Sequence, residues 1–462
     1  MLLEMAADGF GDRVAVGTRP GGLTYAALRD RATGIAATLG ADPTTVALLG
    51  ETSALVPATL FGATWAGAAY APLNYRLPAE ARDELLTRLA PVVVANDSWL
   101  QVDADPTRPF VDEPTRPAVL LFTSGTTAAP KAATLSHEQL TAYIFNTVEF
   151  GAADEDEAVL VAVPPFHVAG VAAVLSSTYA GRRLVPLPRF SPEAWLATAR
   201  TEAVTHAFVV PTMLARIVAV IEADPSVGVP TLRHLAYGGS RMPIPVLERA
   251  LAAFPDTGFV NAYGLTETSS TVSVLGPDEH RAAHESDDPS VRARLGSVGR
   301  PVPGIELRVV DAEIQIRGAQ VSGDYLEAGS ERDGDGWLHT GDRGSVDDDG
   351  YVFIEGRGDD TIIRGGENLA PAEIEDTLLR HPAVAGAAVV GIPDEEWGER
   401  VGAMVVARAG VSIEPEAVAD FVRGHLGSLK TPELIVVTDE LPHTATGKIL
   451  RRAVRDDLAG RG

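Results

Sequence analysis

The stretch from Leu121 to His137 reads LFTSGTTAAPKAATLSH, and it carries the strongest local signal for a ligand site in the chain. Its apolar start predicts a short buried strand, which five small hydroxyl or glycine residues follow. Such residues let backbone N–H groups and hydroxyls close around phosphate oxygens, and Lys131 adds a positive charge. It is not a Walker A loop, because Pro130 stands where that loop has glycine before the lysine. The alternative is a Ser/Thr/Gly loop that feeds a helix, for which Ser136 and Gln139 form a capping box.

Six later motifs resemble, in order, those of the adenylate-forming (AMP-binding) enzyme superfamily, and the pattern is of the acyl-/aryl-CoA synthetase type. They are YGLTE at 263–267, GWLHTGD at 336–342, GRGDD at 356–360, GGEN at 365–368, PAEIE at 371–375 and TATGK at 444–448. The chain departs from the family at Ala128 and Ala132, where glycine is usual. The phosphate loop therefore carries extra methyl groups, and their effect on the ATP step is left open.

The resemblance assigns most of the expected site residues to ATP. The loop after the first strand would hold the phosphates, and a Gly-Gly-Ser turn with the next strand end would contact adenine and substrate. An aspartate of the HTGD motif would accept both ribose hydroxyls, and an arginine would contact the ribose. These residues are Thr123, Ser124, Gly125, Thr126, Thr127, Lys131, Gly238, Gly239, Ser240, Asn261, Ala262, Tyr263, Gly264, Asp342 and Arg357.

Glu267 is the expected metal ligand. A carboxylate beside a triphosphate is repelled unless a metal ion lies between them, so Glu267, next to Thr266 at a strand end, indicates Mg²⁺. The resemblance adds Thr126 as a second metal ligand and Thr266 to the catalytic residues. The alternative for Glu267 is a carboxylate that only favours a helix N-terminus.

Lys448 is the expected catalytic lysine, because its counterpart in the family bridges carboxylate and phosphate. The alternative is an exposed basic residue before a terminal helix. In relatives a small domain swings about a hinge between the two half-reactions, and Asp359 matches the hinge position. Gly365 and Gly366 match the loop along which pantetheine passes.

Composition narrows the classes of function. The 462-residue chain has 63 acidic and 38 basic residues and a net charge of −25, which argues against nucleic acid and membrane as partners. It has no cysteine, so an enzyme-bound thioester is excluded and a thiol acceptor must come from outside. Lysine occurs only at positions 131, 430 and 448, which suggests that a compact ammonium group is needed there.

The order of predicted elements indicates an α/β fold. Alternating strands and helices predict a large N-terminal domain at residues 1–356, built of parallel-type sheets. It would include a small β-subdomain within about 300–356, and a mobile α+β C-terminal domain would occupy 357–462. The charged segment 276–296 lacks an apolar period and is expected to be a surface loop. With neither a signal peptide nor a membrane-spanning apolar run, the protein is expected in the cytoplasm.

The resemblance implies an ATP-dependent carboxylic acid–CoA ligase that forms AMP in two steps. ATP and the acid would give acyl-AMP and pyrophosphate with Mg²⁺, and CoA would then take the acyl group. The alternative is an adenylation enzyme that loads the acid onto the phosphopantetheine of an acyl carrier protein. A luciferase-type oxygenase shares the same motifs. Which acid is used, the oligomeric state and the pathway are left open.

The acid is predicted to be a hydrophobic or aromatic monocarboxylic acid. Amino-acid-activating relatives carry aspartate just after Phe166, where this chain has His167, a residue that borders the acyl pocket in the family. The alternative for His167 is a histidine satisfied by backbone. Tyr237 is expected to close off a long alkyl tunnel. The segments expected to line the pocket are apolar or small, and burying an unpaired second charge there would cost several kcal/mol; these segments are 168–171, 237–239 and 261–264.

Overall fold

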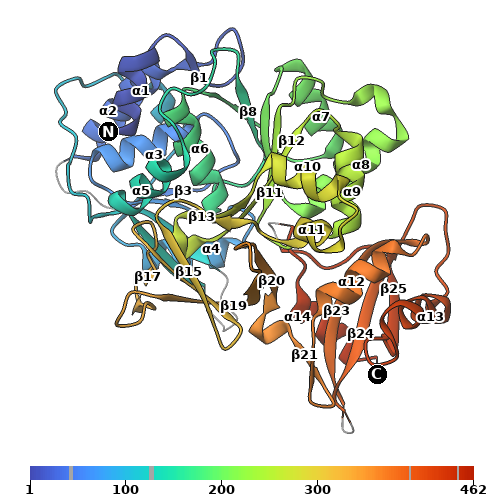
Figure 1. Ribbon diagram of the computed structural model, residues 1–462. Helices are drawn as coiled ribbons and strands as arrows, with labels where there is room; N and C mark the ends of the chain where they lie inside the picture. The colour runs from blue at the N-terminus through green and yellow to red at the C-terminus, as the bar shows by residue number, and fades with distance from the viewer. Residues whose placement is uncertain (41–44, 124–129, 395–396, 445–446, 462) are drawn as a thin grey trace.

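A computed structural model of the chain describes residues 1–40, 45–123, 130–394, 397–444 and 447–461, without the side chains of Asp359 and Asn368. Two large sheets with their helices form the N-terminal part, a small sheet follows, and the C-terminal part stands beside them (Figure 1). This mixed α/β architecture confirms the predicted fold class. Among the helices of the described ranges, none is both long and apolar enough to cross a bilayer.

The largest sheet has nine strands in the order β14-β13-β12-β11-β10-β8-β9-β1-β2. From β12 to β1 neighbouring strands run parallel, because crossover segments return the chain to the same edge. The carboxyl ends of its parallel strands therefore meet at one edge, where ligands of such sheets bind. The strands are β1 (Val14–Val16), β2 (Leu23–Thr24), β8 (Ala158–Val161), β9 (Arg183–Pro186), β10 (His206–Val209), β11 (His234–Gly238), β12 (Gly258–Leu265), β13 (Ser270–Leu275) and β14 (Arg300–Pro301).

The second sheet has seven strands in the order β18-β17-β7-β6-β4-β3-β5 and contains the phosphate-loop stretch. The predicted buried strand is β6, and the capping box of Ser136 and Gln139 does begin α5 (His137–Thr147). The loop does not feed that helix directly, because β7 intervenes and pairs with β6 in antiparallel fashion. The strands are β3 (Thr45–Leu48), β4 (Tyr70–Pro72), β5 (Val92–Val94), β6 (Pro117–Thr123), β7 (Lys131–Ser136), β17 (Asp324–Tyr325) and β18 (Gly329–Ser330).

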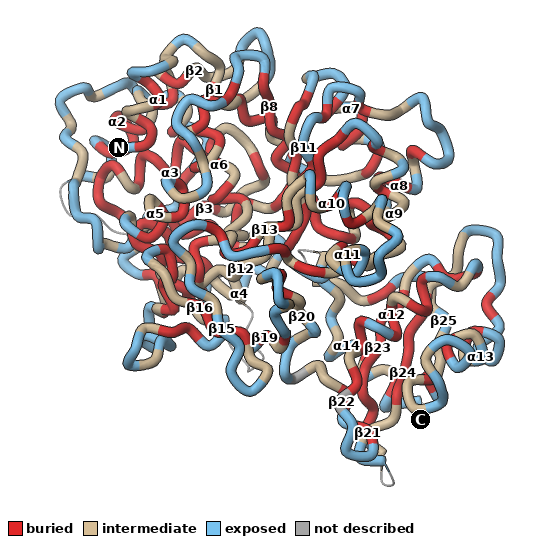
Figure 2. Tube along the Cα trace, viewed as in Figure 1, coloured by how far each residue is buried: buried red, intermediate tan, exposed pale blue. Residues whose placement is uncertain are grey.

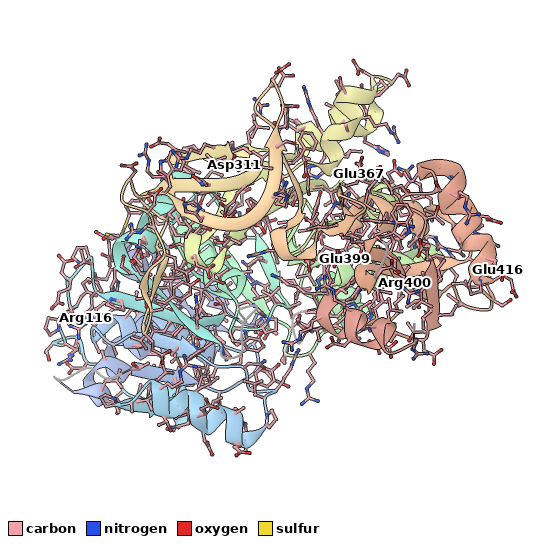
Figure 3. The ribbon with its side chains drawn as sticks, turned by 90° about the horizontal axis from the view of Figure 1, so that it is seen from below. Arg116, Asp311, Glu367, Glu399, Arg400 and Glu416 are labelled. Carbon is pink, nitrogen blue, oxygen red and sulfur yellow. The ribbon has the colours of Figure 1, made fainter. Side chains whose placement is uncertain are left out.

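Helices and the two large sheets alternate in layers, with buried residues along the strands and the inner helix faces (Figure 2). One core lies between the sheets and includes α1 (Leu2–Phe10), α2 (Tyr25–Leu39), α3 (Leu55–Trp65), α5 and α6 (Val168–Ala180). The other face of the nine-stranded sheet packs on α7 (Pro192–Thr201), α8 (Pro211–Ala223), α9 (Ile244–Ala253) and α10 (Pro277–Glu285). Helix α4 (Ala79–Arg88) covers the seven-stranded sheet. Charged side chains such as Asp311, Glu367 and Glu416 stand on the outside (Figure 3).

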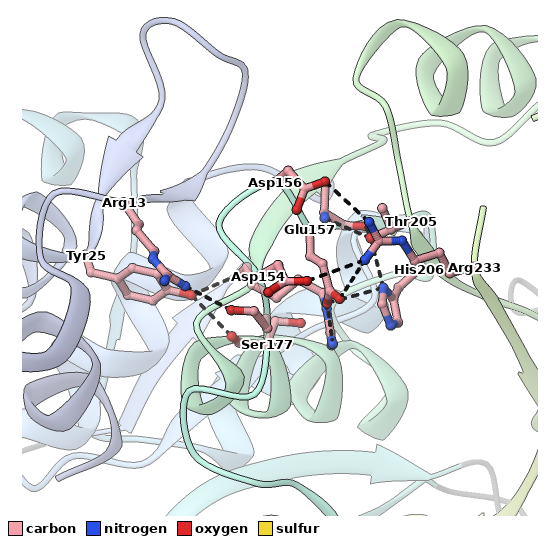
Figure 4. A network of polar contacts seen from close by, with 12 residues as sticks. Arg13, Tyr25, Asp154, Asp156, Glu157, Ser177, Thr205, His206 and Arg233 are labelled. Carbon is pink, nitrogen blue, oxygen red and sulfur yellow. Dashed lines mark hydrogen bonds and ion pairs between the residues drawn. The ribbon is translucent and has the colours of Figure 1, made fainter. Parts of the chain in front are cut away.

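A polar network joins the amino ends of the parallel strands (Figure 4). Arg233, just before β11, donates to Glu157 Oε1, just before β8, at 3.2 Å. The hydroxyl of Thr205, just before β10, lies 3.1 Å from the carbonyl oxygen of Ala158 and 2.9 Å from Nδ1 of His206. These contacts hold three neighbouring strands in register at the edge opposite to the predicted ligand edge.

The expectation of a surface loop at 276–296 is wrong. The segment forms α10, α11 (Pro289–Ala293) and a 3₁₀ turn at Arg294–Gly296. Helix α10 begins where the amide of Gly276 donates to Glu279 Oε2 at 2.7 Å. Only His280 and Ala283 of α10 are buried, and they lie three residues apart on one face. Two buried positions are too few to produce a recognisable apolar period in the sequence.

A four-stranded antiparallel sheet follows, formed by β15 (Ile305–Val310), β16 (Glu313–Gly318), β19 (Leu338–Val346) and β20 (Val352–Arg357). The chain then passes through a 3₁₀ turn at Gly358–Asp360 into the C-terminal sheet. That sheet comprises β21 (Ile362–Arg364), β22 (Glu367–Leu369), β23 (Val384–Asp394), β24 (Gly398–Ala407) and β25 (Leu434–Thr438), and it packs with α12 (Pro371–Arg380), α13 (Pro415–Leu426) and α14 (Arg451–Ala459). The change of sheet agrees with the predicted boundary at residue 357, which stays a prediction.

Candidate active site

The carboxyl edge of the nine-stranded sheet carries the glycine turn and the YGLTE strand side by side. Gly238 ends β11, and Gly239 follows with φ of +80°, a left-handed conformation that glycine adopts without strain. A Cβ on Gly238 would lie 2.3 Å from the carbonyl oxygen of Ala262 on β12, so this close approach requires glycine. Ser240 lies just beyond and is exposed. Two predicted segments that are far apart in sequence thus share one edge.

Asp342 is the polar centre of this edge. The hydroxyl of Tyr263, on β12, donates to Asp342 Oδ2 at 2.7 Å, and Arg357 Nε lies 2.8 Å from Oδ1. Asp342 on β19 and Arg357 on β20 are direct cross-strand partners. Burial, followed by the charge of Asp342, raises the pKa of Tyr263, which therefore stays a hydroxyl donor. Each carboxylate oxygen keeps a second lone pair, so Asp342 can still accept two ribose hydroxyls.

Lys448 lies within electrostatic range of these groups. Its pKa is lowered first by desolvation and then by the guanidinium of Arg357, although the residue is exposed to solvent. The carboxylates of Asp342 and Glu267 act in the opposite sense and raise it. The lysine of the last motif is thus brought to both carboxylates that the sequence assigned to the nucleotide site.

His167, the residue just before α6, also lies near Lys448. Burial lowers the pKa of His167 to about 4, and the nearby cations Lys448 and Arg76 contribute further. Its Nε2 is buried and has no hydrogen-bond partner among the described residues. The ring of Phe166, next in the chain, meets Tyr75 edge-on at 5.9 Å. The imidazole is therefore neutral and its Nε2 is unpaired, beside the ring of Phe166 and near the cations Lys448 and Arg76, and the alternative of a backbone-satisfied histidine does not hold for Nε2.

Glu267 lies in the 3₁₀ turn Thr266–Thr268 that follows β12. Its Oε1 accepts a hydrogen bond from the hydroxyl of Tyr325 at 2.6 Å. Lys131 Nζ stands 5.0 Å from the centre of that tyrosine ring and 2.5 Å from Glu331 Oε1. Tyr325 thus links the expected metal ligand to the phosphate-loop lysine. No sequence motif marks Tyr325, so the sequence offered no signal for it.

The remaining expected residues differ in where they lie. Ser124, Gly125, Thr126 and Thr127 fall outside the described residues, as does the side chain of Asp359. The others have these positions. Thr123 ends β6, and the side-chain amide of Asn261 donates to the carbonyl oxygen of Ser297 at 3.0 Å. Gly264 follows Tyr263, and a Cβ placed on it would lie 1.8 Å from the carbonyl oxygen of Ser270. Gly365 and Gly366 form the tip of the β21–β22 hairpin, which points away from the N-terminal part in Figure 1.

The expectation that Tyr237 closes a long alkyl tunnel is wrong. Tyr237 is fully buried in the core beneath α7 to α10, and its hydroxyl lies 2.8 Å from Nε2 of His280. The other ring nitrogen of His280 contacts the carbonyl oxygen of Gly276 at 2.8 Å, so it carries the proton and Nε2 accepts from the tyrosine. The side chain is therefore committed to α10. On the opposite face of the sheet an apolar cavity adjoins the His167 segment, lined by residues that include Val161, Val163, Pro165 and Gly170.

The carboxylate of Glu267 is a suitable ligand for Mg²⁺. In the described part of the chain, no group of three or more acidic or histidine side chains could enclose a metal ion by itself. Mg²⁺ usually takes one or two protein carboxylates and completes its shell with phosphate and water oxygens, so the single carboxylate of Glu267 is a sufficient protein ligand for it.

Comparisons with known proteins agree with this geometry. Family models described as AMP-binding enzyme and AMP-binding enzyme C-terminal domain match residues 3–108 with 93–326, and residues 373–448. A fatty acid–[acyl-carrier-protein] ligase of Streptomyces coeruleorubidus is 35% identical and covers 90% of this chain and 87% of its own. A feruloyl-CoA synthase of an Amycolatopsis species is 36% identical, covering 96% and 95%. The solved o-succinylbenzoate CoA synthetase of Bacillus subtilis, in complex with ATP and magnesium ion, is 26% identical with a TM-score of 0.81, covering 99% and 98%.

Proposed function

The chain belongs to the AMP-binding enzyme family, and from that premise we propose that it joins a hydrophobic or aromatic monocarboxylic acid to CoA. The general reaction, an AMP-forming acid–CoA ligation with ATP, Mg²⁺ and CoA, rests on the family and on its named CoA-ligase relatives. The class of acid, the acceptor and the role of each residue are parts of the proposal.

The reaction balances in two steps. A carboxylate oxygen of the acid attacks the α-phosphorus of ATP, the bond from that phosphorus to its bridging oxygen breaks, and pyrophosphate leaves with the electron pair. The thiol of CoA, as thiolate, then attacks the acyl carbon of acyl-AMP, and AMP leaves with the electrons of the carbon–oxygen bond. The first step brings two anions together, so the site must stabilise the negative charge that develops on the oxygens.

The observation that carries the proposal is the convergence of Lys448, Asp342 and Glu267 from three separate segments of the chain. Lys448 would bridge the carboxylate of the acid and the α-phosphate, and Asp342 would hold the ribose. Glu267 would hold Mg²⁺, whose charge offsets that of the phosphates. The neutral ring of His167 would border the acid without attracting a second carboxylate.

An ATP–pyrophosphate exchange assay over a panel of acids tests the substrate class. Aryl, alicyclic and medium-chain acids should exchange orders of magnitude faster than malonate or glycine, because the segments expected to line the pocket are apolar or small and would leave an extra charge unpaired. Palmitate belongs in the panel without an expected rank, since Tyr237 does not limit chain length. The Lys448→Ala variant serves as the blank. Malonate or an amino acid as the best substrate would refute the acid class and leave the adenylation chemistry intact.

An acyl carrier protein is the second candidate acceptor, favoured by the named carrier-protein ligase among the relatives. Purified acyl-AMP offered to CoA and to a phosphopantetheinylated carrier protein separates the two. Faster transfer to CoA is expected. Transfer only to the carrier protein would show that the enzyme loads a carrier protein and does not use CoA.

A further inference from the structure

We propose that Arg241 and Asp376 form an ion-pair latch that docks the C-terminal part on the N-terminal part while Lys448 occupies the active site. Arg241 would then be a positioning residue for acyl-AMP formation, acting through the placement of Lys448. The inference rests on the proposed two-step function, and on the expectation from the family resemblance that the C-terminal part turns about the segment near Asp359 between the steps.

The latch has the geometry of a bidentate pair. Arg241 Nη1 lies 3.0 Å from Asp376 Oδ1, and Nη2 lies 2.5 Å from Oδ2. Nη1 is also 3.5 Å from the carbonyl oxygen of Ala372, one turn earlier on α12. The side chain of Asp376 is only 13% exposed and that of Arg241 33% exposed, so solvent screens this pair less than an open surface pair. The planar guanidinium matches both carboxylate oxygens, which fixes orientation as well as distance.

The two partners stand on opposite sides of the proposed hinge. Arg241 follows directly on the Gly238–Ser240 turn at the ligand edge of the nine-stranded sheet. Asp376 lies on α12, which contacts α9 of the N-terminal part. A rotation of the C-terminal part about residues 358–360 must therefore break the pair. In the arrangement that carries this contact, Lys448 lies within electrostatic range of Asp342 and Glu267.

A second contact places the lysine segment in the same arrangement. Thr212, in the first turn of α8, donates through Oγ1 to the carbonyl oxygen of Gly447 at 3.3 Å. Gly447 has φ of +81°, and a Cβ there would lie 2.7 Å from Thr212 Oγ1. The residue before Lys448 is thus seated against the N-terminal part by backbone, and one neutral hydrogen bond is a weak hold. The charged pair on α12 is the stronger fastening.

The same helix offers a matched control. Glu373, on the first turn of α12, pairs with Lys430 Nζ at 2.6 Å. Both residues belong to the C-terminal part, so their ion pair is the same whichever way that part is turned. Glu373→Gln removes a carboxylate charge from α12, as Asp376→Asn does, without touching the contact between the two parts.

Single-turnover measurements of the two half-reactions test the latch. Arg241→Gln and Asp376→Asn should each slow pyrophosphate release about three- to tenfold, and conversion of presynthesised acyl-AMP with CoA should stay the same or become faster. Combining the two substitutions should slow the first step no further. Arg241→Lys, which keeps the charge and loses the fork, should be intermediate, and the exchanged pair Arg241→Glu with Asp376→Arg should recover most of the rate.

Three results would overturn the latch: an equal effect of Glu373→Gln, parallel loss of both half-reactions, or additive effects of the two substitutions. The wild-type protein separates this failure from failure of the proposed function. If the wild-type protein forms acyl-AMP and the thioester, the proposed function is supported. The ratio of the rates of these two half-reactions in the variants then tests the latch alone.

A readout without catalysis is available because the chain has no cysteine. Spin labels on Glu193→Cys in α7 and Glu416→Cys in α13, both exposed, report the distance between the two parts. Asp376→Asn should broaden the distance distribution of the unliganded protein, and Glu373→Gln should leave it unchanged. Identical distributions in all three proteins would contradict the latch.

Discussion

His167 and Lys448 are two of the basic side chains at the site, and they differ in charge. Burial, with smaller contributions from Lys448 and Arg76, lowers the pKa of His167 to about 4, so it is neutral at physiological pH. Lys448 is left as the cation that can offset repulsion between a carboxylate and a phosphate. A protonated His167 would instead have added a further positive charge to those of Lys448 and Arg76 and favoured a dianionic substrate. The difference between the two residues therefore bears on both the chemistry and the choice of acid.

Replacing Lys448 with alanine should separate the half-reactions. Formation of acyl-AMP should fall by about three orders of magnitude, because the site loses the charge placed between the two anions. Conversion of presynthesised acyl-AMP with CoA should continue, since in the proposed function the lysine serves only the first step. Rapid-quench assays of both steps measure this, with Lys430→Ala as the control. An adenylation rate near that of the wild type would show that Lys448 has been wrongly assigned.

At the level of elements, the sequence predicted those that carry their own local signal. The strand predicted at the start of the stretch 121–137 is β6, and the capping box of Ser136 and Gln139 begins α5. Strand β7 was missed because it follows the phosphate loop with no turn signal of its own. Helix α10 was missed because only two of its residues are buried. Periodicity reveals an element only when enough of one face is apolar.

The site was predictable where a motif carries it. The motifs predicted that the segments of Asp342, Glu267 and Lys448 share a site, and the fold brings Lys448 within electrostatic range of both carboxylates. Tyr325 and the pair of Arg241 with Asp376 were not identified. They act through contacts across 58 and 135 residues of sequence, which no local pattern records.

The turn between β20 and β21 contains Asp359, the expected hinge residue. Asp359→Pro should keep ATP–pyrophosphate exchange and lose thioester formation, because proline fixes φ near −65° and hinders rotation. Asp359→Ala, which leaves the backbone free to turn, should keep both steps. Equal loss of both steps in the proline variant would indicate misfolding and exclude a hinge at this residue.

Over the whole molecule, the nine-stranded sheet separates chemistry from support. Its carboxyl edge carries Tyr263, which donates to Asp342, and leads to His167, whereas its amino edge carries the network of Glu157, Arg233 and His206. Helix α10 adds His280, which is 1% exposed and bonded to Tyr237. These histidines all precede the link to the C-terminal part. Acid should therefore act first on the N-terminal part.

The last prediction concerns this sensitivity to pH. Burial is the largest cause that lowers the pKa of His280 to about 4 and that of His206 to about 3, against an ordinary value of 6.5. Between each lowered pKa and 6.5, the unfolded chain binds more protons than the folded one. The contribution of these histidines to the free energy of unfolding is therefore complete above pH 6.5 and is lost as the pH falls toward 4. His280 alone accounts for roughly 3 kcal/mol of this free energy of unfolding at most.

Thermal unfolding of His280→Gln should show a lower Tm at pH 7.5 and a smaller fall in Tm between pH 7.5 and 5 than the wild type. The exposed His425→Gln is the control and should keep the wild-type fall. An unchanged pH dependence in His280→Gln would mean that His280 is not among the groups that acid must protonate to unfold the N-terminal part.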